Sequence, residues 1–366
     1  MRYSPALLNP TTWLPTLKTA QLQKIAQATG IRSAGPKAAL ISRLETELAQ
    51  CEYPAPSIPS TAKTKPRIRN LSILSIDMGI RNLAFAHLLV PSPQSAQGTT
   101  RMTPTLNAWR RLAVSDLLPG PGLSLPESGL IKGIEPSEID ELNDLACQKD
   151  KDGKEMFHPS PYAKQAYILI TTLLEKYQPT HILIERQRFR SGGGSAVQEW
   201  TLRVGVFEGM LYAVLYALRR ERGVTSGSSC GSAPVVLGVE PQRVVRYWGD
   251  GLGGDGVETK KGRSTAREGK KVKMDLVGGW LDDALTDGER DLKVAVSGEE
   301  ELRGWVEAYL AKWKGVKRRR GETGGVDIGK LDDLADCLLQ GVTWLDWHIM
   351  RDRISREGVG ALDMID

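Results

Sequence analysis

Short, uninterrupted runs of apolar residues along the chain predict the strands of a sheet. The run Leu71–Ile76 predicts a central strand that ends at Asp77. A turn at residues 78–80 leads directly into a second apolar run, Leu83–Val90, and so short a connection predicts an antiparallel hairpin. Three further strands are predicted over residues 106–114, 181–184 and 235–239.

Longer segments repeat their apolar residues at the spacing of an α-helix. We predict helices over residues 162–177, from about residue 197 to residue 222, and over residues 331–350. The candidate core positions are Trp200, Val204, Phe207, Leu211 and Leu218 in the second helix, and Leu334, Cys337, Leu338 and Leu345 in the third. Because strands alternate with long helices and the first two strands form a hairpin, we expect an α/β domain with a mixed sheet flanked by helices.

The beginning of the chain predicts a separate, small helical hairpin. Leu22 and Ile25 lie on one face of a first helix that ends at Gly30, and Pro36 begins a second helix with Leu40 on its apolar face. The predicted parts of the chain are this hairpin (1–50), a basic proline-rich linker (51–70), the α/β domain (71–350) and a C-terminal tail (351–366). Within the domain we interpret residues 115–160, 223–232 and 249–300 as insertions, with a loop rich in glycine, lysine and arginine at 249–273.

Composition narrows the class of protein. The 366 residues are 40% hydrophobic, which is enough for a large core, and the net charge of +5 is compatible with nucleic acid as a partner. The four cysteines form no CxxC pair, so we expect neither a structural zinc site nor a disulfide framework. The chain contains no run of 18 apolar residues, so we expect no membrane span. The first 44 residues contain no Asp or Glu, a pattern typical of organelle import and equally of a basic DNA-binding module.

Acidic side chains stand at the ends of the predicted core elements. Asp77 follows the first strand and Glu185 follows the strand at 181–184, while Asp332, Asp333 and Asp336 open the last helix. Functional sites in open α/β sheets gather at the carboxyl ends of strands, so Asp77 and Glu185 become neighbours if their strands pair. Each acid alone has an ordinary explanation as a turn residue or a helix cap. Their order along one domain favours a common catalytic site.

Carboxylates gathered this closely repel one another unless a cation lies between them. On a helix, Asp336 shares a face with both Asp332 and Asp333. Oxygen-only ligands favour Mg²⁺, with Mn²⁺ as a substitute, and such ions activate water and stabilise the leaving oxygen of a phosphodiester. The pattern therefore predicts a metal-dependent nuclease, with no small-molecule cofactor.

Three segments resemble the fungal mitochondrial cruciform-cutting endonucleases, which are Holliday-junction resolvases related to bacterial RuvC in the ribonuclease-H-like superfamily. The segments are residues 75–84, 184–191 and 330–336, and the resemblance covers roughly residues 70–350. The apolar, glycine and lysine spacing over residues 17–44 is similar to the SAP motif, a helical DNA-binding module, and includes Lys37.

The resemblance implies a ribonuclease-H-like fold, a homodimer, Mg²⁺, a mitochondrial location, and paired symmetric nicks across a four-way DNA junction. It implies that Asp77, Glu185 and Asp336 are metal ligands. The spacing of three residues favours Asp333 as the fourth ligand, while Asp332 stays an alternative.

Basic residues cluster around the predicted site. The segment after Glu185 contributes Arg186, Gln187, Arg188, Phe189 and Arg190, and further candidate DNA contacts are Lys260, Lys261 and Lys330. Arginines beside a metal site would oppose phosphates, and Phe189 would stack on an unpaired base. The alternatives are a solvated basic surface and a buried phenylalanine.

Two other functions fit the same residues. A ribonuclease acting on RNA–DNA hybrids or structured RNA would use the same fold and carboxylates. A non-catalytic protein that binds DNA junctions would need no metal. A resolvase must present two active sites, and we predict the helix at about 197–222 as its dimer element, with Trp200, Leu211 and Tyr212 available for contacts.

Overall fold

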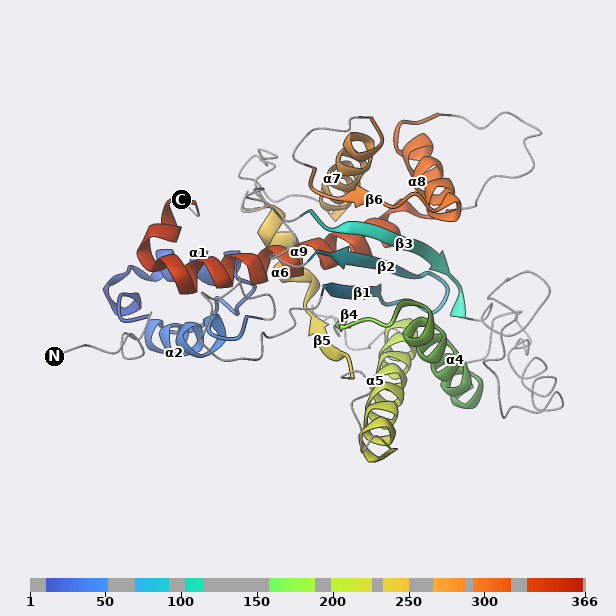
Figure 1. Cartoon of the computed structure of the whole chain (residues 1–366), viewed down its shortest axis with the longest axis horizontal. Helices are drawn as coiled ribbons and strands as arrows, with labels where there is room; N and C mark the ends of the chain where they lie inside the picture. The colour runs from blue at the N-terminus through green and yellow to red at the C-terminus, as the bar shows by residue number, and fades with distance from the viewer. Residues whose placement is uncertain are drawn as a thin grey trace, which may run out of the picture.

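The computed structural model describes residues 11–51, 70–91, 103–114, 158–187, 199–225, 233–249, 266–286, 292–316 and 328–364. Its centre is a six-stranded sheet in the order β5-β4-β1-β2-β3-β6 (Figure 1). The strands are β1 (Leu71–Asp77), β2 (Leu83–Val90), β3 (Thr105–Leu112), β4 (His181–Glu185), β5 (Val235–Val239) and β6 (Ala295–Val296). The β1–β2 and β2–β3 pairs are antiparallel, whereas β1–β4, β4–β5 and β3–β6 are parallel. The predicted mixed sheet and the predicted β1–β2 hairpin are confirmed.

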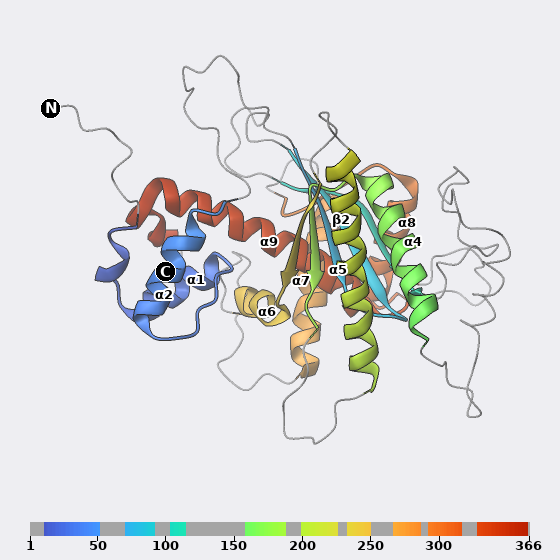
Figure 2. The ribbon, with the colours of Figure 1, turned by 90° about the horizontal axis from the view of Figure 1, so that it is seen from below.

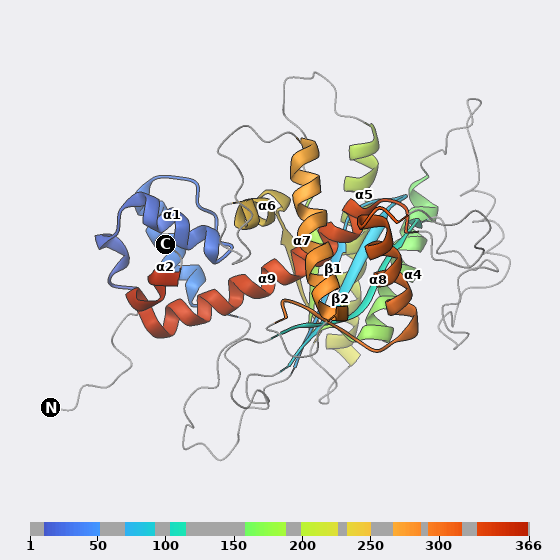
Figure 3. The ribbon, with the colours of Figure 1, turned by 90° about the horizontal axis from the view of Figure 1, so that it is seen from above.

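Two layers of helices cover the sheet, because apolar side chains point to both of its faces. On one face lie α4 (Pro159–Tyr177) and α5 (Glu199–Thr225), which bury Phe207 and Leu211 against the strands (Figure 2). On the other face lie α7 (Ala266–Thr286), α8 (Glu300–Trp313) and α9 (Leu331–Glu357) (Figure 3). The short helix α6 (Pro241–Gly249) packs against α9 beside them.

The predicted loop at 249–273 is wrong from residue 266 onward, where α7 begins. The first turns of α7 are rich in lysine and glycine, a composition typical of loops. Further along α7, Val277, Trp280 and Leu281 follow at helical spacing and are buried. The sequence analysis also missed α6, β6 and α8. Trp200, predicted in the core, is 41% exposed instead, because the buried side of α5 begins only at Val204.

Helix α9 is longer than predicted and joins the two parts of the molecule. The predicted end at Met350 is wrong: the helix continues to Glu357, and a 3-10 helix, η4 (Gly358–Met364), follows it. Residues expected as a tail therefore belong to folded structure. Ile354 and Ala361 are buried in the apolar core of the N-terminal helical hairpin, and this burial is the physical reason that α9 extends so far.

The N-terminal hairpin packs on the C-terminal half of α9 (Figure 1). It consists of the 3-10 helix η2 (Leu14–Thr16), α1 (Thr19–Ala28) and α2 (Lys37–Leu48). At the end of α1, Arg351 Nε donates to Thr29 O at 2.7 Å, and Arg243 Nη1 donates to Gly30 O at 3.0 Å. Gly30 has a φ of 64° and lies directly against Trp347 of α9. The hairpin is thus fixed to the domain through its turn.

Substituting Gly30 by alanine is expected to loosen this docking. An alanine at positive φ costs about 1–2 kcal/mol, and its Cβ would overlap the Trp347 ring, so we expect a total loss of roughly 2–4 kcal/mol in the free energy of unfolding. Urea unfolding and amide hydrogen exchange of α1 and α2 would measure it. Gly279→Ala in α7 is the matched control, because its Cβ meets no neighbouring atom within 4 Å. Unchanged exchange protection in Gly30→Ala would contradict the docking described here.

Candidate active site

The ends of β1 and β4 bring Asp77 and Glu185 together. The two strands run parallel with Ile76 opposite Ile184, so the next residue in each strand is an acid. Asp77 is only 9% exposed and its carboxyl group is hydrogen-bonded to Glu185. Burial raises the pKa of Asp77 well above its ordinary value, and the nearby charges of Glu185, Asp336 and Asp333 raise it further. The predicted neighbourhood of these two acids is confirmed.

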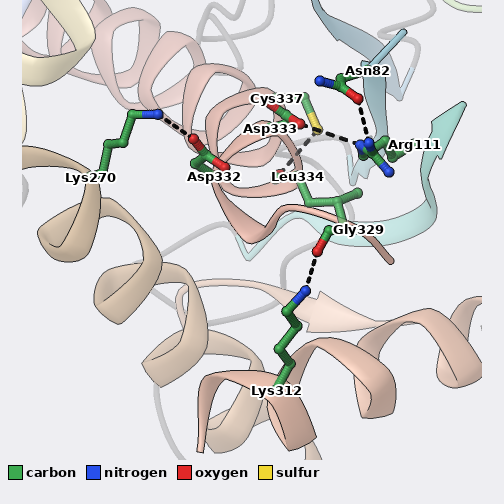
Figure 4. A network of polar contacts seen from close by, with 9 residues as sticks. All are labelled: Asn82, Arg111, Lys270, Lys312, Gly329, Asp332, Asp333, Leu334 and Cys337. Carbon is green, nitrogen blue, oxygen red and sulfur yellow. Dashed lines mark hydrogen bonds and ion pairs between the residues drawn. The ribbon is translucent and has the colours of Figure 1, made fainter. Parts of the chain in front are cut away.

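Helix α9 supplies three more acids, Asp332 and Asp333 in its first turn and Asp336 one turn later. The two acids of the first turn have different partners. Lys270 Nζ of α7 lies 2.5 Å from Asp332 Oδ2, whereas Asp333 lies on the side of α9 that faces Arg111 of β3 (Figure 4). Burial alone would raise the pKa of Asp332, but the hydrogen bond and charge of Lys270 lower it below its ordinary value. Asp333 is among the charges that raise the pKa of Asp77.

Asp333 and Asp336 are each close to a cation. Lys273 Nζ of α7 lies 2.8 Å from Asp336 Oδ1, and Arg111 Nε lies 3.3 Å from Asp333 Oδ2. The second contact is electrostatic only, since both of its buried atoms lack a well-formed hydrogen bond within the described part of the chain. Burial and the neighbouring Asp332 raise the pKa of Asp333 to about 6, although Arg111 and Lys330 oppose that rise. Burial likewise raises the pKa of Asp336, against the charge of Lys273.

Two parts of the chain match known protein families. Residues 73–354 match the family model described as "Mitochondrial resolvase Ydc2 / RNA splicing MRS1". The chain belongs to this family. Residues 13–49, the helical hairpin, match the SAP domain model. The recognition of this resolvase family and of its SAP module from sequence motifs is therefore confirmed.

Two relatives of this Ydc2-family chain extend the match over nearly its whole length. "Cruciform cutting endonuclease 1, mitochondrial" from Schizosaccharomyces pombe (strain 972 / ATCC 24843) is 26% identical over 335 residues, covering 92% of this chain and 94% of the relative. The solved structure titled "Crystal Structure of the Yeast Mitochondrial Holliday Junction Resolvase, Ydc2" matches with a TM-score of 0.51 and 22% identity, covering 93% of this chain and 98% of that one. This likeness confirms the predicted fold, a mixed sheet flanked by helices with a small N-terminal helical hairpin.

The acids of the Ydc2-family site fit a divalent metal by their chemistry. Asp77, Glu185, Asp333 and Asp336 offer only oxygen donors, and Asp333 Oδ2 is a buried acceptor with no hydrogen bond within the described residues. Besides burial, repulsion from neighbouring carboxylates raises the pKa values of Asp77, Asp333 and Asp336, and a bound cation would remove that repulsion. In the described ranges, no three His, Cys, Asp or Glu side chains are already grouped around one point, since Lys273 and Arg111 compete for Asp336 and Asp333.

The raised pKa values predict how metal and pH affect stability. The metal-free folded protein holds protons more tightly than the unfolded chain, so its stability falls as pH rises between about 4 and about 6 through Asp333. Because one pKa unit corresponds to about 1.4 kcal/mol, this contribution is on the order of 3 kcal/mol. Mg²⁺ replaces those protons, so we expect it to raise the melting temperature more at pH 7 than at pH 5.

Thermal unfolding in EDTA and in Mg²⁺ at the two pH values would test this expectation. Asp333→Asn removes one titrating carboxyl group. It should therefore reduce the difference between the melting-temperature shifts that Mg²⁺ causes at pH 5 and at pH 7. Asp283→Asn is the matched control, because this aspartate of α7 is exposed and lies outside the acidic cluster. An identical pH dependence in the wild type and in Asp333→Asn would contradict the role given to Asp333.

The predicted DNA contacts are only partly described by the structure. Arg186 and Gln187 follow Glu185 directly, and Lys330 is the exposed N-cap residue of α9. Lys37 is exposed in the hairpin, where its Nζ donates to Pro15 O at 3.0 Å. The other candidates lie outside the described residues, namely Arg188, Phe189, Arg190, Lys260 and Lys261.

Several residues around the acids escaped the sequence analysis. Lys270 and Lys273 lie in the segment predicted as a loop at 249–273, but they belong to α7, which turns them toward the acids of α9. Their spacing of three residues was the available signal for one helical face. Gln340, buried in α9, donates from Nε2 to Ser75 Oγ at 3.0 Å and fixes α9 against β1 near Asp77. No local pattern marks Gln340 or Arg111, since their partners are distant in sequence.

Proposed function

We propose that this protein is a Mg²⁺-dependent endonuclease that resolves four-way DNA junctions by paired symmetric nicks, in mitochondrial DNA recombination and segregation. The observation that carries the proposal is that Asp77 and Glu185 end two paired strands, β1 and β4, while the charges of Asp333 and Asp336 of α9 act on Asp77. Family membership supports it, because the family description names a mitochondrial resolvase. The name of the curated relative supports both the cutting of cruciforms and a mitochondrial location. Within the mitochondrion we propose the matrix or nucleoid.

In this proposal Asp77, Glu185, Asp333 and Asp336 hold the metal, and Mn²⁺ is able to replace Mg²⁺. Asp333 is preferred to Asp332 because its charge raises the pKa of Asp77, whereas Asp332 is paired with Lys270. When bound, the metal supplies a Lewis acid for the phosphodiester and lowers the pKa of a water molecule. The lysines of α7 balance the acidic charge while the metal is absent.

The proposed substrate contacts begin directly beside the acids. The side chain of Arg186 is 60% exposed, so its guanidinium group is accessible to a phosphate of the cleaved strand. We propose Gln187, Lys330 and Lys37 as further contacts, together with Arg188, Phe189, Arg190, Lys260 and Lys261 outside the described residues. A second proposed partner is another copy of the chain.

A homodimer is supported by the outer face of α5. Leu202 and Val206 are 46% and 44% exposed, Tyr216 is 68% exposed, and the small residues Gly209 and Ala213 lie between them at helical spacing. By length and composition alone, residues 199–221 would suffice to cross a membrane, but their inner face is packed in the domain core. A second copy of α5 against this stripe would bury it. Leu211, predicted as a dimer contact, is fully buried against the sheet instead, because it lies on the inner face of α5.

A second candidate function is action on RNA, because the family description also names RNA splicing. The deciding experiment is cleavage in Mg²⁺ of a labelled four-way junction, beside linear duplex and an RNA–DNA hybrid. Paired nicks confined to the junction would establish the resolvase. Cutting of the hybrid instead would favour the ribonuclease alternative. Tight junction binding without cutting in Mg²⁺ or Mn²⁺ would leave a non-catalytic junction-binding protein.

A further inference from the structure

The backbone just after Glu185 is held from two sides. The N–H of Arg186 donates to Val239 O at 2.9 Å, which extends the pairing between β4 and β5 by one residue. The N–H of Gln187 donates to Glu208 Oε2 of α5 at 3.1 Å. The first peptide after the strand is therefore fixed by the sheet, and the second is fixed by a side chain of the neighbouring helix.

Glu208 interacts with both an acid and a base of the proposed site. It is half-buried in α5, and burial raises its pKa above the ordinary value. The Gln187 N–H and the charge of Arg186 oppose that rise, while the charge of Glu185 adds to it. Glu208 thus acts on all three residues of the segment 185–187, although it stands 21 positions beyond Gln187 in the sequence.

The side chain of Arg186 leaves the sheet through a narrow space formed beside Glu208. A Cβ on Gly238 of β5 would lie 2.8 Å from Arg186 Cδ and 2.9 Å from the hydroxyl of Tyr212, so only glycine leaves room there. Tyr212 lies one helical turn after Glu208, on the same face of α5. Beyond this space the guanidinium group is mostly exposed, 3.9 Å from Glu240.

We propose that Glu208 is a positioning residue for the nuclease reaction, and this inference rests on the proposed function. Its carboxylate holds the 185–187 backbone so that Glu185 faces Asp77 while Arg186 points outward to a phosphate. A strand end without this hydrogen bond would rotate and separate the two groups. Partners of this kind, which orient a metal ligand without touching the metal, change activity or metal affinity about 10–100-fold when removed.

Glu208→Ala and Glu208→Gln separate this role from a merely structural one. Alanine removes the acceptor, so we expect kcat for junction cleavage to fall about 10–100-fold and the Mg²⁺ concentration for half-activation to rise about tenfold. The KM for the junction should change little, because Arg186 and the other contacts remain. Glutamine keeps an oxygen acceptor for the Gln187 N–H and should restore kcat to within about threefold of the wild type. Glu199→Ala, at the exposed start of α5, is the matched control.

A second readout does not depend on cleavage. Mn²⁺ titrated against the full chain should raise the melting temperature of the wild type and of Glu208→Gln, and should require about tenfold more metal in Glu208→Ala. If the wild type binds Mn²⁺ but cuts no junction, the proposed function fails, while a tenfold higher metal requirement in Glu208→Ala would still show that Glu208 positions the metal ligand Glu185. The positioning role is wrong if Glu208→Ala and the wild type have the same kcat and require the same metal concentration. It is also wrong if Glu208→Ala and Glu208→Gln are impaired equally.

Discussion

Replacing Asp77 by asparagine is expected to lower the rate of junction cleavage about a thousandfold, equivalent to ~4 kcal/mol of lost transition-state stabilisation. The substituted side chain would keep its shape but lose its negative charge. Asp77 is the most enclosed of the acids, and the charges of Glu185, Asp336 and Asp333 all act on it, so it stands at the centre of the proposed metal site. A neutral amide there is a much weaker ligand for a divalent ion.

The same substitution should have the opposite effect on the stability of the metal-free protein. A buried carboxyl group that repels its neighbours is removed, so Asp77→Asn is expected to melt at a higher temperature than the wild type in EDTA at pH 7. Cleavage under single-turnover conditions, junction binding in EDTA and thermal unfolding would measure the three effects. Asp283→Asn serves as the control for the loss of one carboxylate. If Asp77→Asn still cleaves junctions at the wild-type rate, the proposal that Asp77 belongs to the catalytic site is wrong.

Introducing a charge into the outer stripe of α5 is expected to separate the proposed dimer. In Val206→Glu a carboxylate replaces an apolar side chain at the middle of the stripe, beside Leu202 and Gly209. Burying that charge against a second copy is unfavourable, so we expect the dimer dissociation constant to rise at least about a hundredfold, or ~2.7 kcal/mol. Each monomer keeps its own acids, because these lie on β1, β4 and α9 rather than on α5.

The separation of subunits should change the products of cleavage. Paired nicks linearise a plasmid that carries a cruciform, whereas independent nicks leave a nicked circle, so we expect Val206→Glu to shift the product from linear to nicked DNA. Sedimentation equilibrium would give the mass of each variant. Leu285→Glu is the matched control, because this leucine of α7 is 38% exposed and lies away from α5. Dimeric Val206→Glu with normal linear product would place the dimer interface elsewhere.

Much of the fold can be predicted from local patterns of apolar and polar residues in the sequence. The apolar runs at β1, β2 and β5 were predicted close to their observed bounds. For β1 and β2 the reason is that a strand in the middle of a sheet is buried on both faces, whereas β5 is an apolar run at the edge of the sheet. Glu185 and Asp77 were predicted as neighbours because the acids directly follow two such strands. These inferences needed only the alternation of strands and helices, since strand ends gather at one edge of the sheet.

Other features depend on partners that are distant in sequence. The apolar spacing in α9 predicts an end at Met350. The helix continues because Ile354 is buried against the N-terminal hairpin. Trp200 has the spacing of a core residue, yet it precedes the part of α5 that meets the sheet. Lys273 belongs to a basic run that resembles solvated surface, and only the packing of α7 against α9 turns it toward Asp336.

The sequence by itself determined the class of fold, the order of the acids along the chain and the family to which the chain belongs, because periodicity and motif spacing are local properties. The tertiary structure alone shows what each aspartate at the start of α9 meets. Asp332 and Asp333 share a helical face with Asp336 equally well, and the rotation of α9 between α7 and the sheet places Asp332 beside Lys270 and Asp333 beside Arg111. The position of Glu208 beside Gln187 has the same origin, since it depends on how α5 packs against the end of β4.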